Sequence, residues 1–485
     1  MGQFFQLQDL QVIIPELELA FFGMLLLIAD LVIPEKKTIG WFALIGIGGS
    51  AFSLYKLFGR EATLAYGGAI VVDSLAWFFK LLFLVAAAIT ILLSMRYLEV
   101  EREHHGEFYS LILFATMGMM FMASAMDLVT LYIGLETMAI ATYILVGFLR
   151  GNQRSNEASL KYFLLGAFSS AILLYGFSLL YGFSGSTRFL EIGNFLGSAP
   201  PDNPILLIAV VAVVAGLFFK IAAVPFHQWT PDAYEGAPTS VTGFMSVAVK
   251  AASFVMIWRV LFFIIGPMRP YWIPILTVAC ILTMTLGNIA AIAQTNVKRL
   301  LAYSSISHAG YVLIGFIAGN ETSFSRMGMA AVPLYLLVYT FTNLGVWAVV
   351  VALRRKNILG ERIDDMNGLF FRHPASAILM LIFLLSLAGI PPTAGFIAKY
   401  YLFAAAVQSH HNVLAVIAVI NAAISAFYYL RIVVAMFMNN ATETTGMDLS
   451  AGVRITLAAA FVFTLGVGLY PGPIIELAYR AISLQ

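Results

Sequence analysis

The stretch from Leu217 to Lys250 reads LFFKIAAVPFHQWTPDAYEGAPTSVTGFMSVAVK and decides how the rest of the chain is interpreted. It places two lysines, a histidine, two carboxylates and three prolines in a chain that is otherwise apolar enough to lie in lipid. A charged side chain at the centre of a membrane costs about 3 kcal/mol or more, and such residues usually mark a path for ions. Prolines free backbone groups that lipid tolerates only where protein or a cavity covers them. The stretch therefore predicts a broken helix on an ion pathway.

Composition places the whole chain in the membrane. Of its 485 residues, 61% are hydrophobic and only 11% are charged, whereas an average soluble domain is about 25% charged. The net charge of +2 comes without any basic tract, so nothing indicates nucleic-acid binding. The single cysteine, Cys280, can form neither an intrachain disulfide nor a cysteine metal cluster. The first apolar run, Val12 to Ile33, is expected to be a retained helix and not a signal peptide.

Apolar spans of about 20 residues predict an all-α integral membrane protein with about fourteen transmembrane helices. The seventh (205–226) is interrupted at Val224-Pro225, and the twelfth (375–407) at Gly389-Ile390-Pro391-Pro392. The two broken helices are five positions apart, and an odd number of spans reverses the orientation in the membrane. Helices 4–8 and 9–13 are therefore expected to be inverted five-helix repeats. The expected divisions are 1–106 (helices 1–3), 107–264 (first repeat), 265–438 (second repeat) and 439–485 (helix 14). The longest connections, 184–204 and 354–374, are too short for a soluble domain.

Lysines and arginines in the loops predict the orientation. Fourteen of them follow odd-numbered helices and seven follow even-numbered ones, and cytoplasmic loops carry such an excess. Both termini of this multi-pass protein are therefore expected on the non-cytoplasmic side. Lys80, near the start of helix 3, is expected to be an anchor that extends to the membrane surface.

Four ionisable residues lie at membrane depth: Glu136 in helix 5, Lys220 in helix 7, Lys250 halfway along helix 8 and Lys399 in helix 12. A charge that comes within 4 Å changes the energy of a lysine by about 4 kcal/mol at an effective dielectric near 20, which is enough to change its protonation state. We therefore expect a proton relay in which Glu136 tunes Lys220 and the groups form one polar row along the membrane midplane. The alternative for Glu136 is a structural pair that fixes helix packing.

Three further candidates carry an open alternative. Lys161, near the start of helix 6, is expected in the same row but could instead extend to the interface. His227, after the break in helix 7, and His308, early in helix 10, titrate near neutral pH and suit a relay. Each histidine could equally be a buried donor to a backbone carbonyl. Hydroxyls that could bridge titratable groups surround His308 in the sequence: Tyr303, Ser304, Ser305 and Ser307.

Four segments of the chain carry a family resemblance: K-x4-PFHxWxPDAYEGAPT (Lys220 to Thr239), IGLETMAI around Glu136, KRLLAYSSISHAGY (Lys298 to Tyr311) and LAGIPPTAGFIAKYYLF (Leu387 to Phe403). Together they resemble the antiporter-like membrane subunits of the proton-pumping NADH:quinone oxidoreductase, respiratory complex I, over almost the whole chain. The YEGAPT sequence, and the lysine at position 399 where a sister subunit has glutamate, resemble subunit N of that family.

The resemblance implies a non-redox subunit of a translocase enzyme, in which Glu136, Lys220, Lys250 and Lys399 transfer protons. Lys161 and His227 match the family less decisively. NADH, FMN, iron–sulfur clusters and quinone are expected in other subunits, so no cofactor is expected on this chain. Expected neighbours are the sister subunit M, the small subunits K and J, and lipid of the cell inner membrane.

Two other functions remain open at this point. A component of a multi-subunit Na⁺/H⁺ antiporter would keep the buried lysines but fits the YEGAPT wording less well. A purely structural membrane spacer should avoid lysines inside the membrane, so Lys220, Lys250 and Lys399 argue against it.

Overall fold

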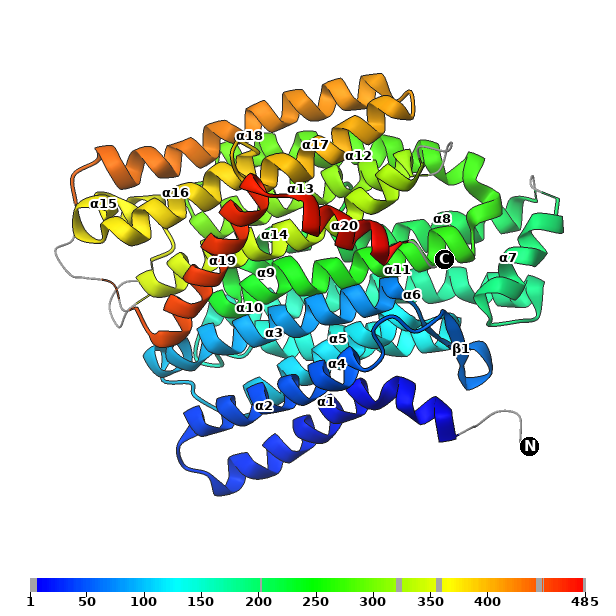
Figure 1. Ribbon diagram of the computed structural model, residues 1–485, viewed down its shortest axis with the longest axis horizontal. Coiled ribbons are helices and arrows are strands. Elements are labelled where there is room, and N and C mark those ends of the chain that lie inside the picture. Colours follow the sequence, from blue (N-terminus) through cyan, green and yellow to red (C-terminus); the bar gives the residue numbers. More distant parts are fainter. Residues whose placement is uncertain are drawn as a thin grey trace.

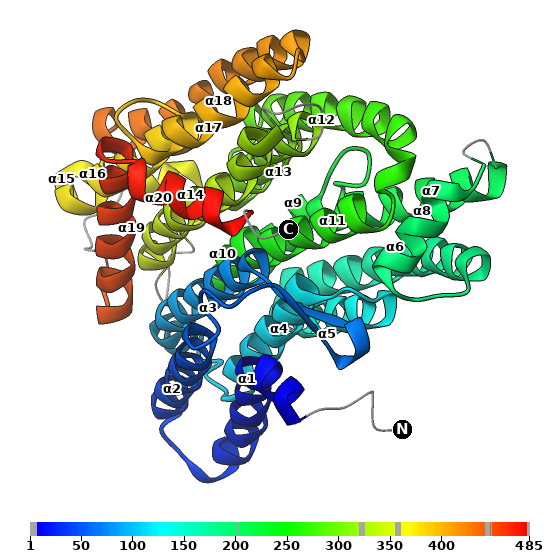
Figure 2. The same cartoon turned by 45° about the vertical axis from the view of Figure 1, so that its right-hand side comes forward.

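The computed structural model describes residues 7–200, 203–319, 325–354, 360–441, 447 and 449–482. The loop charges Arg355 and Lys356 lie outside these residues. Within them the chain is almost entirely helical, and most of the long helices run in roughly one direction (Figure 1). Helices α1 and α2 lie at one edge of the bundle and α18 at the opposite edge (Figure 2). The predicted all-α membrane architecture is confirmed.

Thirteen spans in the described residues are long and apolar enough to cross a membrane. The predicted twelfth span is divided between two shorter helices, α16 (Pro374–Ala388) and α17 (Ala394–Gln408), and together they complete the predicted fourteen. The other spans are α1 (Leu7–Val32), α2 (Lys36–Tyr55), α3 (Ser74–Glu101), α4 (Glu107–Ser124), α5 (Leu128–Val146), α6 (Gln153–Ser184), α8 (Pro204–Ile221), α10 (Thr239–Phe244) continuing into α11 (Lys250–Phe263), α12 (Arg269–Ile292), α13 (Val297–Ala318), α14 (Ser325–Leu353), α18 (Asn412–Met438) and α19 (Ala451–Leu469).

Both predicted breaks have the same geometry. The first helix ends at a residue with a left-handed backbone, Ala222 (φ 60°) or Gly389 (φ 87°). A cis peptide bond follows, at Val224-Pro225 or Pro391-Pro392. The chain then resumes as α9 (Trp229–Gly236) or as α17. Because the last carbonyls of a helix have no intrahelical partner, each break leaves backbone oxygens available to polar groups inside the bundle.

Short elements occupy segments that were expected to be loops or tails. Hydropathy over about 20 residues detects only long spans, so these elements left no signal. They are the hairpin of β1 (Thr63–Ala65) and β2 (Ile70–Val72), which pairs Leu64 with Val71, together with α7 (Phe189–Ser198), α15 (Leu369–Arg372) and α20 (Gly472–Ala481).

The interior of the bundle is formed by α13, α14 and the α10–α11 span, whose apolar windows are about nine-tenths buried within the protein. These helices lie between α3–α6 on one side and α12, α17 and α18 on the other (Figure 2). A helix enclosed by protein can carry polar side chains that a lipid-facing helix could not. The centre of the bundle is therefore where buried titratable groups can gather.

Two buried ion pairs correct the sequence interpretation. Lys80 does not extend to the membrane surface, because its Nζ lies 2.6 Å from Oε1 of Glu16 and both side chains are at most 4% exposed. Arg259, one of the seven lysines and arginines that follow even-numbered helices in the predicted topology, lies inside α11. Its guanidinium donates to both carboxylate oxygens of Asp73, at 2.7 and 2.8 Å. Each pair neutralises charges that would be costly to bury alone.

Candidate functional site

The first half of the site joins α5, α6 and α8. Lys220 lies in the last turn of α8, directly before the break, and its Nζ donates a hydrogen bond to Oγ of Ser170 at 3.1 Å. The Oε1 of Glu136 on α5 is buried and accepts no hydrogen bond from the described residues. No direct ion pair joins Glu136 to Lys220 within the described part of the chain. Polar groups separated in this way are commonly bridged by water.

Lys250 occupies the middle of the α10–α11 span and is 4% exposed. A π-helical turn, Met245–Val249, directly precedes it, and such turns are frequent at functional sites. The Nζ of Lys250 donates to the carbonyl oxygen of Ser305 at 2.6 Å and to its hydroxyl at 2.5 Å. The mid-span lysine predicted from the sequence is thus bound to two neutral oxygens of α13.

His308 is held between two tyrosines. Its Nδ1 lies 2.6 Å from the hydroxyl of Tyr335 on α14, and its Nε2 lies 3.1 Å from the hydroxyl of Tyr429 on α18. Tyr429 is also hydrogen-bonded to Ser304. The alternative in which His308 binds a backbone carbonyl is wrong. Since a tyrosine hydroxyl can donate and accept, His308 can exchange a proton on either side of its ring.

Lys399 lies in α17 and turns back toward the break. Its Nζ donates to the carbonyl oxygen of Ala388 at 2.8 Å, at the end of α16, where the helix carries partial negative charge. The same Nζ stands 4.9 Å from the centroid of the Tyr311 ring. A cavity of about 10 Å³ separates Lys399 from His308 and is also lined by Tyr339. That volume is about what one water molecule needs.

Lys161 is not part of the buried row that the sequence predicts. Its side chain is 46% exposed and its Nζ lies 2.7 Å from Glu157 Oε1 and 3.0 Å from Asp232 Oδ2. Arg299 binds the same aspartate at 2.7 Å and Glu235 at 2.9 Å. These charges line a cavity of about 330 Å³ that is open to the outside. The structure therefore supports the alternative in which Lys161 extends to the interface.

His227 lies in the loop between α8 and α9 and is half-buried. Within the described residues, no hydrogen bond joins its side chain to Lys220 or Lys250. His308, in contrast, lies one helical turn beyond Ser305, which binds Lys250, and it lines the same small cavity as Lys399. The structure thus brings Lys250, His308 and Lys399 together at the centre, with Lys220 and Glu136 in the first half, and leaves His227 and Lys161 apart.

Hydroxyl side chains from other helices complete the site. The sequence indicates Ser304 and Ser305 because they stand beside His308, but it gives no reason to select hydroxyls from α6, α14 and α18. A serine or tyrosine in an apolar helix is an ordinary packing residue until its partner is known. The residues missed for this reason are Ser170, Tyr335, Tyr339 and Tyr429.

The chain matches known proteins over most of its length. The family described as NADH:quinone oxidoreductase/Mrp antiporter, TM, matches residues 125–425. The chain is 49% identical to NADH-quinone oxidoreductase subunit N 2 of Solibacter usitatus, over 97% of either chain. It is also 49% identical to subunit N 1 of Koribacter versatilis, over 98% of this chain and 96% of that one.

Solved structures show the same likeness. A chain of respiratory complex I from Thermus thermophilus is 34% identical, with a TM-score of 0.81, and the match covers 96% of this chain and all of that one. A chain of the Mrp complex from Dietzia has a TM-score of 0.84 over 98% of this chain and 97% of that one, but is only 21% identical. The second likeness concerns the fold alone, so it does not favour the antiporter alternative.

Proposed function

The chain belongs to the family of NADH-quinone oxidoreductase subunit N, the proton-translocating membrane subunits of that complex. We propose that it carries protons through a relay of five residues inside the helix bundle. The relay comprises Glu136, Lys220, Lys250, His308 and Lys399. Quinone reduction in other subunits of the complex drives it. Two candidates from the sequence lie outside this relay. Lys161 lines the exposed charged cavity, and His227 lies in the loop between α8 and α9.

The observation that carries this proposal is the kind of partner that each buried lysine has. Lys80 and Lys298 each bind a carboxylate, Glu16 at 2.6 Å and Glu361 at 3.2 Å. A lysine of this kind cannot release its proton without leaving its carboxylate unpaired, which is strongly destabilising where the carboxylate is fully buried, as Glu16 is. These lysines are structural.

The three relay lysines bind neutral oxygens instead. In the described residues their hydrogen-bond acceptors are the hydroxyl of Ser170, the hydroxyl and carbonyl of Ser305, and the carbonyl of Ala388. None of these acceptors gains an unpaired charge when the lysine loses its proton. Each lysine can therefore exchange a proton without leaving a directly bound carboxylate unpaired.

The relay has two halves that meet at Lys250. In the first, Lys220 stands in the field of Glu136, so protonation of either group changes the energy of the other. In the second, His308 and its two tyrosines lie between Lys250 and Lys399. A charge that arrives about 4 Å from a lysine shifts its energy by about 4 kcal/mol at an effective dielectric near 20. This is sufficient to pass protonation changes from one group to the next.

We place all redox chemistry in other subunits. The single cysteine of this chain cannot ligate a cluster, and the expected sites for NADH, FMN, iron–sulfur clusters and quinone belong elsewhere in the complex. The partners are other membrane subunits, with subunits M, K and J as the expected neighbours, and lipid. We further propose the cell inner membrane as the location, with both termini on the non-cytoplasmic side as the loop charges indicate.

The test is the variant Lys250→Met in the assembled complex, reconstituted into vesicles. Methionine keeps the length and apolar part of the side chain but carries no titratable proton. We expect NADH oxidation to continue with strongly reduced proton translocation, measured as the pH change inside the vesicles. Lys56→Met, at an exposed lysine beside Phe52, is the matched control. Normal proton translocation by Lys250→Met would refute the relay.

A further inference from the structure

A buried serine binds the π-helical turn to α14. The turn, Met245–Val249, joins α10 to α11, and Ser246 within it is fully buried. The hydroxyl of Ser246 donates a hydrogen bond to the carbonyl oxygen of Gly243 at 2.7 Å. It accepts two hydrogen bonds from α14, from Nδ2 of Asn343 at 2.7 Å and from Nε1 of Trp347 at 3.1 Å. Because a serine hydroxyl has one hydrogen and two lone pairs, these three bonds use its full capacity.

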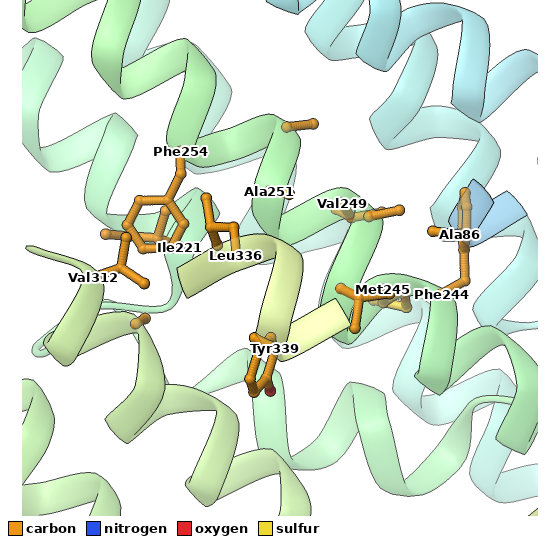
Figure 3. Packing of buried hydrophobic residues seen from close by; sticks show 14 of the residues in the cluster. Ala86, Ile221, Phe244, Met245, Val249, Ala251, Phe254, Val312, Leu336 and Tyr339 are labelled. Atoms are coloured by element: carbon orange, nitrogen blue, oxygen red, sulfur yellow. The ribbon is translucent and has the colours of Figure 1, made fainter. Parts of the chain in front are cut away.

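The side of α14 that carries Asn343 and Trp347 packs directly against this segment. The two residues are four positions apart and therefore share one face of the helix, and both are buried. A Cβ added to Gly243 would stand 3.4 Å from Cβ of Trp347, so the backbone that leads into the turn lies close against α14. Figure 3 shows Met245 and Val249, the two ends of the turn, in the buried apolar cluster.

The turn also determines which neighbouring helix Lys250 faces. In a regular α-helix, residues four positions apart lie on the same face, so Ser246 and Lys250 would point toward the same neighbour. A π-helical turn holds one more residue than an α-helical turn, because its hydrogen bonds join residues i and i+5. Lys250 is therefore rotated relative to Ser246. Ser246 binds α14, whereas Nζ of Lys250 binds the two oxygens of Ser305 on α13, at 2.5 and 2.6 Å.

The helix before the turn is fixed to other parts of the bundle. The hydroxyl oxygens of Ser240 on α10 and Ser94 on α3 are 2.8 Å apart, and Thr242 Oγ1 donates to a carbonyl of α9 at 2.9 Å. An α-helix rotates by about 100° per residue. If the turn lost its extra residue, Lys250 would therefore rotate by up to about 100° relative to α10. Its Nζ would then leave the oxygens of Ser305, since a hydrogen bond requires about 2.7–3.2 Å.

We propose that Asn343 is a positioning residue of the relay, which holds the π-helical turn through Ser246 and so keeps Lys250 on the oxygens of Ser305. This inference rests on the relay proposed above and names the contact that orients its central lysine. Asn343 carries no titratable proton. It acts on proton transfer through the position of Lys250.

The same helix contacts the second half of the relay. Tyr335 lies on α14 about two turns before Asn343, and its hydroxyl is 2.6 Å from Nδ1 of His308. The helix α14 thus touches both the turn that orients Lys250 and the histidine that lies toward Lys399. A displacement of α14 would change both contacts together.

The test uses Asn343→Leu in the assembled complex in vesicles, because leucine resembles asparagine in shape but donates no hydrogen bond. We expect proton translocation to slow by roughly 10²-fold while NADH oxidation continues, which is the loss that a displacement of about 1 Å can cause. In a cryo-EM structure of the variant complex, Nζ of Lys250 should lie beyond hydrogen-bond distance of both oxygens of Ser305.

Variants of Ser246 test the other half of the contact. Ser246→Ala should slow translocation as Asn343→Leu does, and Ser246→Thr, which keeps the hydroxyl, should translocate like the parent. The double variant Ser246→Ala/Asn343→Leu should be no slower than Ser246→Ala, because residues that act through one contact have non-additive effects. If Asn343→Leu fails to assemble, the comparison of Ser246→Ala with Ser246→Thr decides the question.

Thr340→Val is the matched control on α14. Thr340 is buried like Asn343, but its hydroxyl donates to a carbonyl of its own helix, that of Leu336, at 2.7 Å. Valine keeps the shape of threonine and removes only the hydroxyl. Translocation and the position of Lys250 should both remain unchanged.

The two proposals fail in different ways. Normal translocation by Lys250→Met would refute the relay as a whole. Loss of translocation in Lys250→Met, together with normal translocation in Asn343→Leu and Ser246→Ala, would refute only the positioning role. Slow translocation in Asn343→Leu with Lys250 still bound to Ser305 would also refute that role, because Asn343 would then act by another route.

Discussion

Replacing a lysine that neutralises a buried carboxylate should destabilise the protein more than replacing a relay lysine. Lys80→Met leaves Glu16 without its cation, in a site where the carboxylate is completely buried and has no other hydrogen-bond donor among the described residues. Breaking a buried pair by removing one partner costs about 3–5 kcal/mol, whereas replacing both partners by apolar groups is often neutral or stabilising. We therefore expect Lys80→Met to be strongly destabilising and Lys80→Met/Glu16→Leu to recover most of the loss.

Lys250→Met is the contrasting variant, because it leaves only the neutral hydroxyl and carbonyl of Ser305 behind. The carbonyl retains its place in α13, so the loss should be well below that of Lys80→Met. The assay is the temperature at which half of the detergent-solubilised complex remains intact on size-exclusion chromatography, measured for the single variants, the double variant and the parent. Equal losses for Lys80→Met and Lys250→Met, or a double variant as unstable as Lys80→Met, would refute the division into two kinds of lysine.

Three further variants address individual contacts. Gly389→Ala should destabilise the break by about 1 kcal/mol or more, because the φ of Gly389 is +87°. It should also slow proton translocation, because the added Cβ would stand 2.7 Å from Cδ of Lys399. Native electrophoresis measures the stability of the complex, and the vesicle assay measures translocation. Lys161→Ala should change thermal stability and translocation little, since exposed ion pairs contribute little, and a large loss of translocation would place Lys161 in the relay. Tyr335→Phe removes the partner of His308 Nδ1, so we expect a stability loss of about 1–3 kcal/mol and slower translocation, measured by the same two assays.

The sequence predicts what local physics determines and misses what depends on distant contacts. The number of spans and both breaks follow from hydropathy and from the prolines, so they were correct. Lys80 and Lys250 look alike in the sequence, as single lysines in apolar helices. Only the fold shows that Lys80 meets Glu16 of α1, while Lys250 meets Ser305 of α13. The interior position predicted for Lys161 failed for a related reason, because Asp232, which holds it at the exposed cavity, lies 71 positions away.

Irregular backbone coincides with each of the three relay lysines. Lys220 lies two residues before the left-handed Ala222, Lys250 directly follows the π-helical turn, and Lys399 binds a carbonyl that the second break exposes. Lys80, in contrast, lies in the uninterrupted helix α3 and binds a carboxylate. A lysine that must give up its proton cannot rely on a carboxylate, because its release would leave a buried charge. The hydrogen-bond acceptor of such a lysine must therefore be a neutral oxygen. Within a regular helix nearly every carbonyl already accepts a hydrogen bond, but at the break beside Lys399 the irregular backbone leaves one carbonyl available.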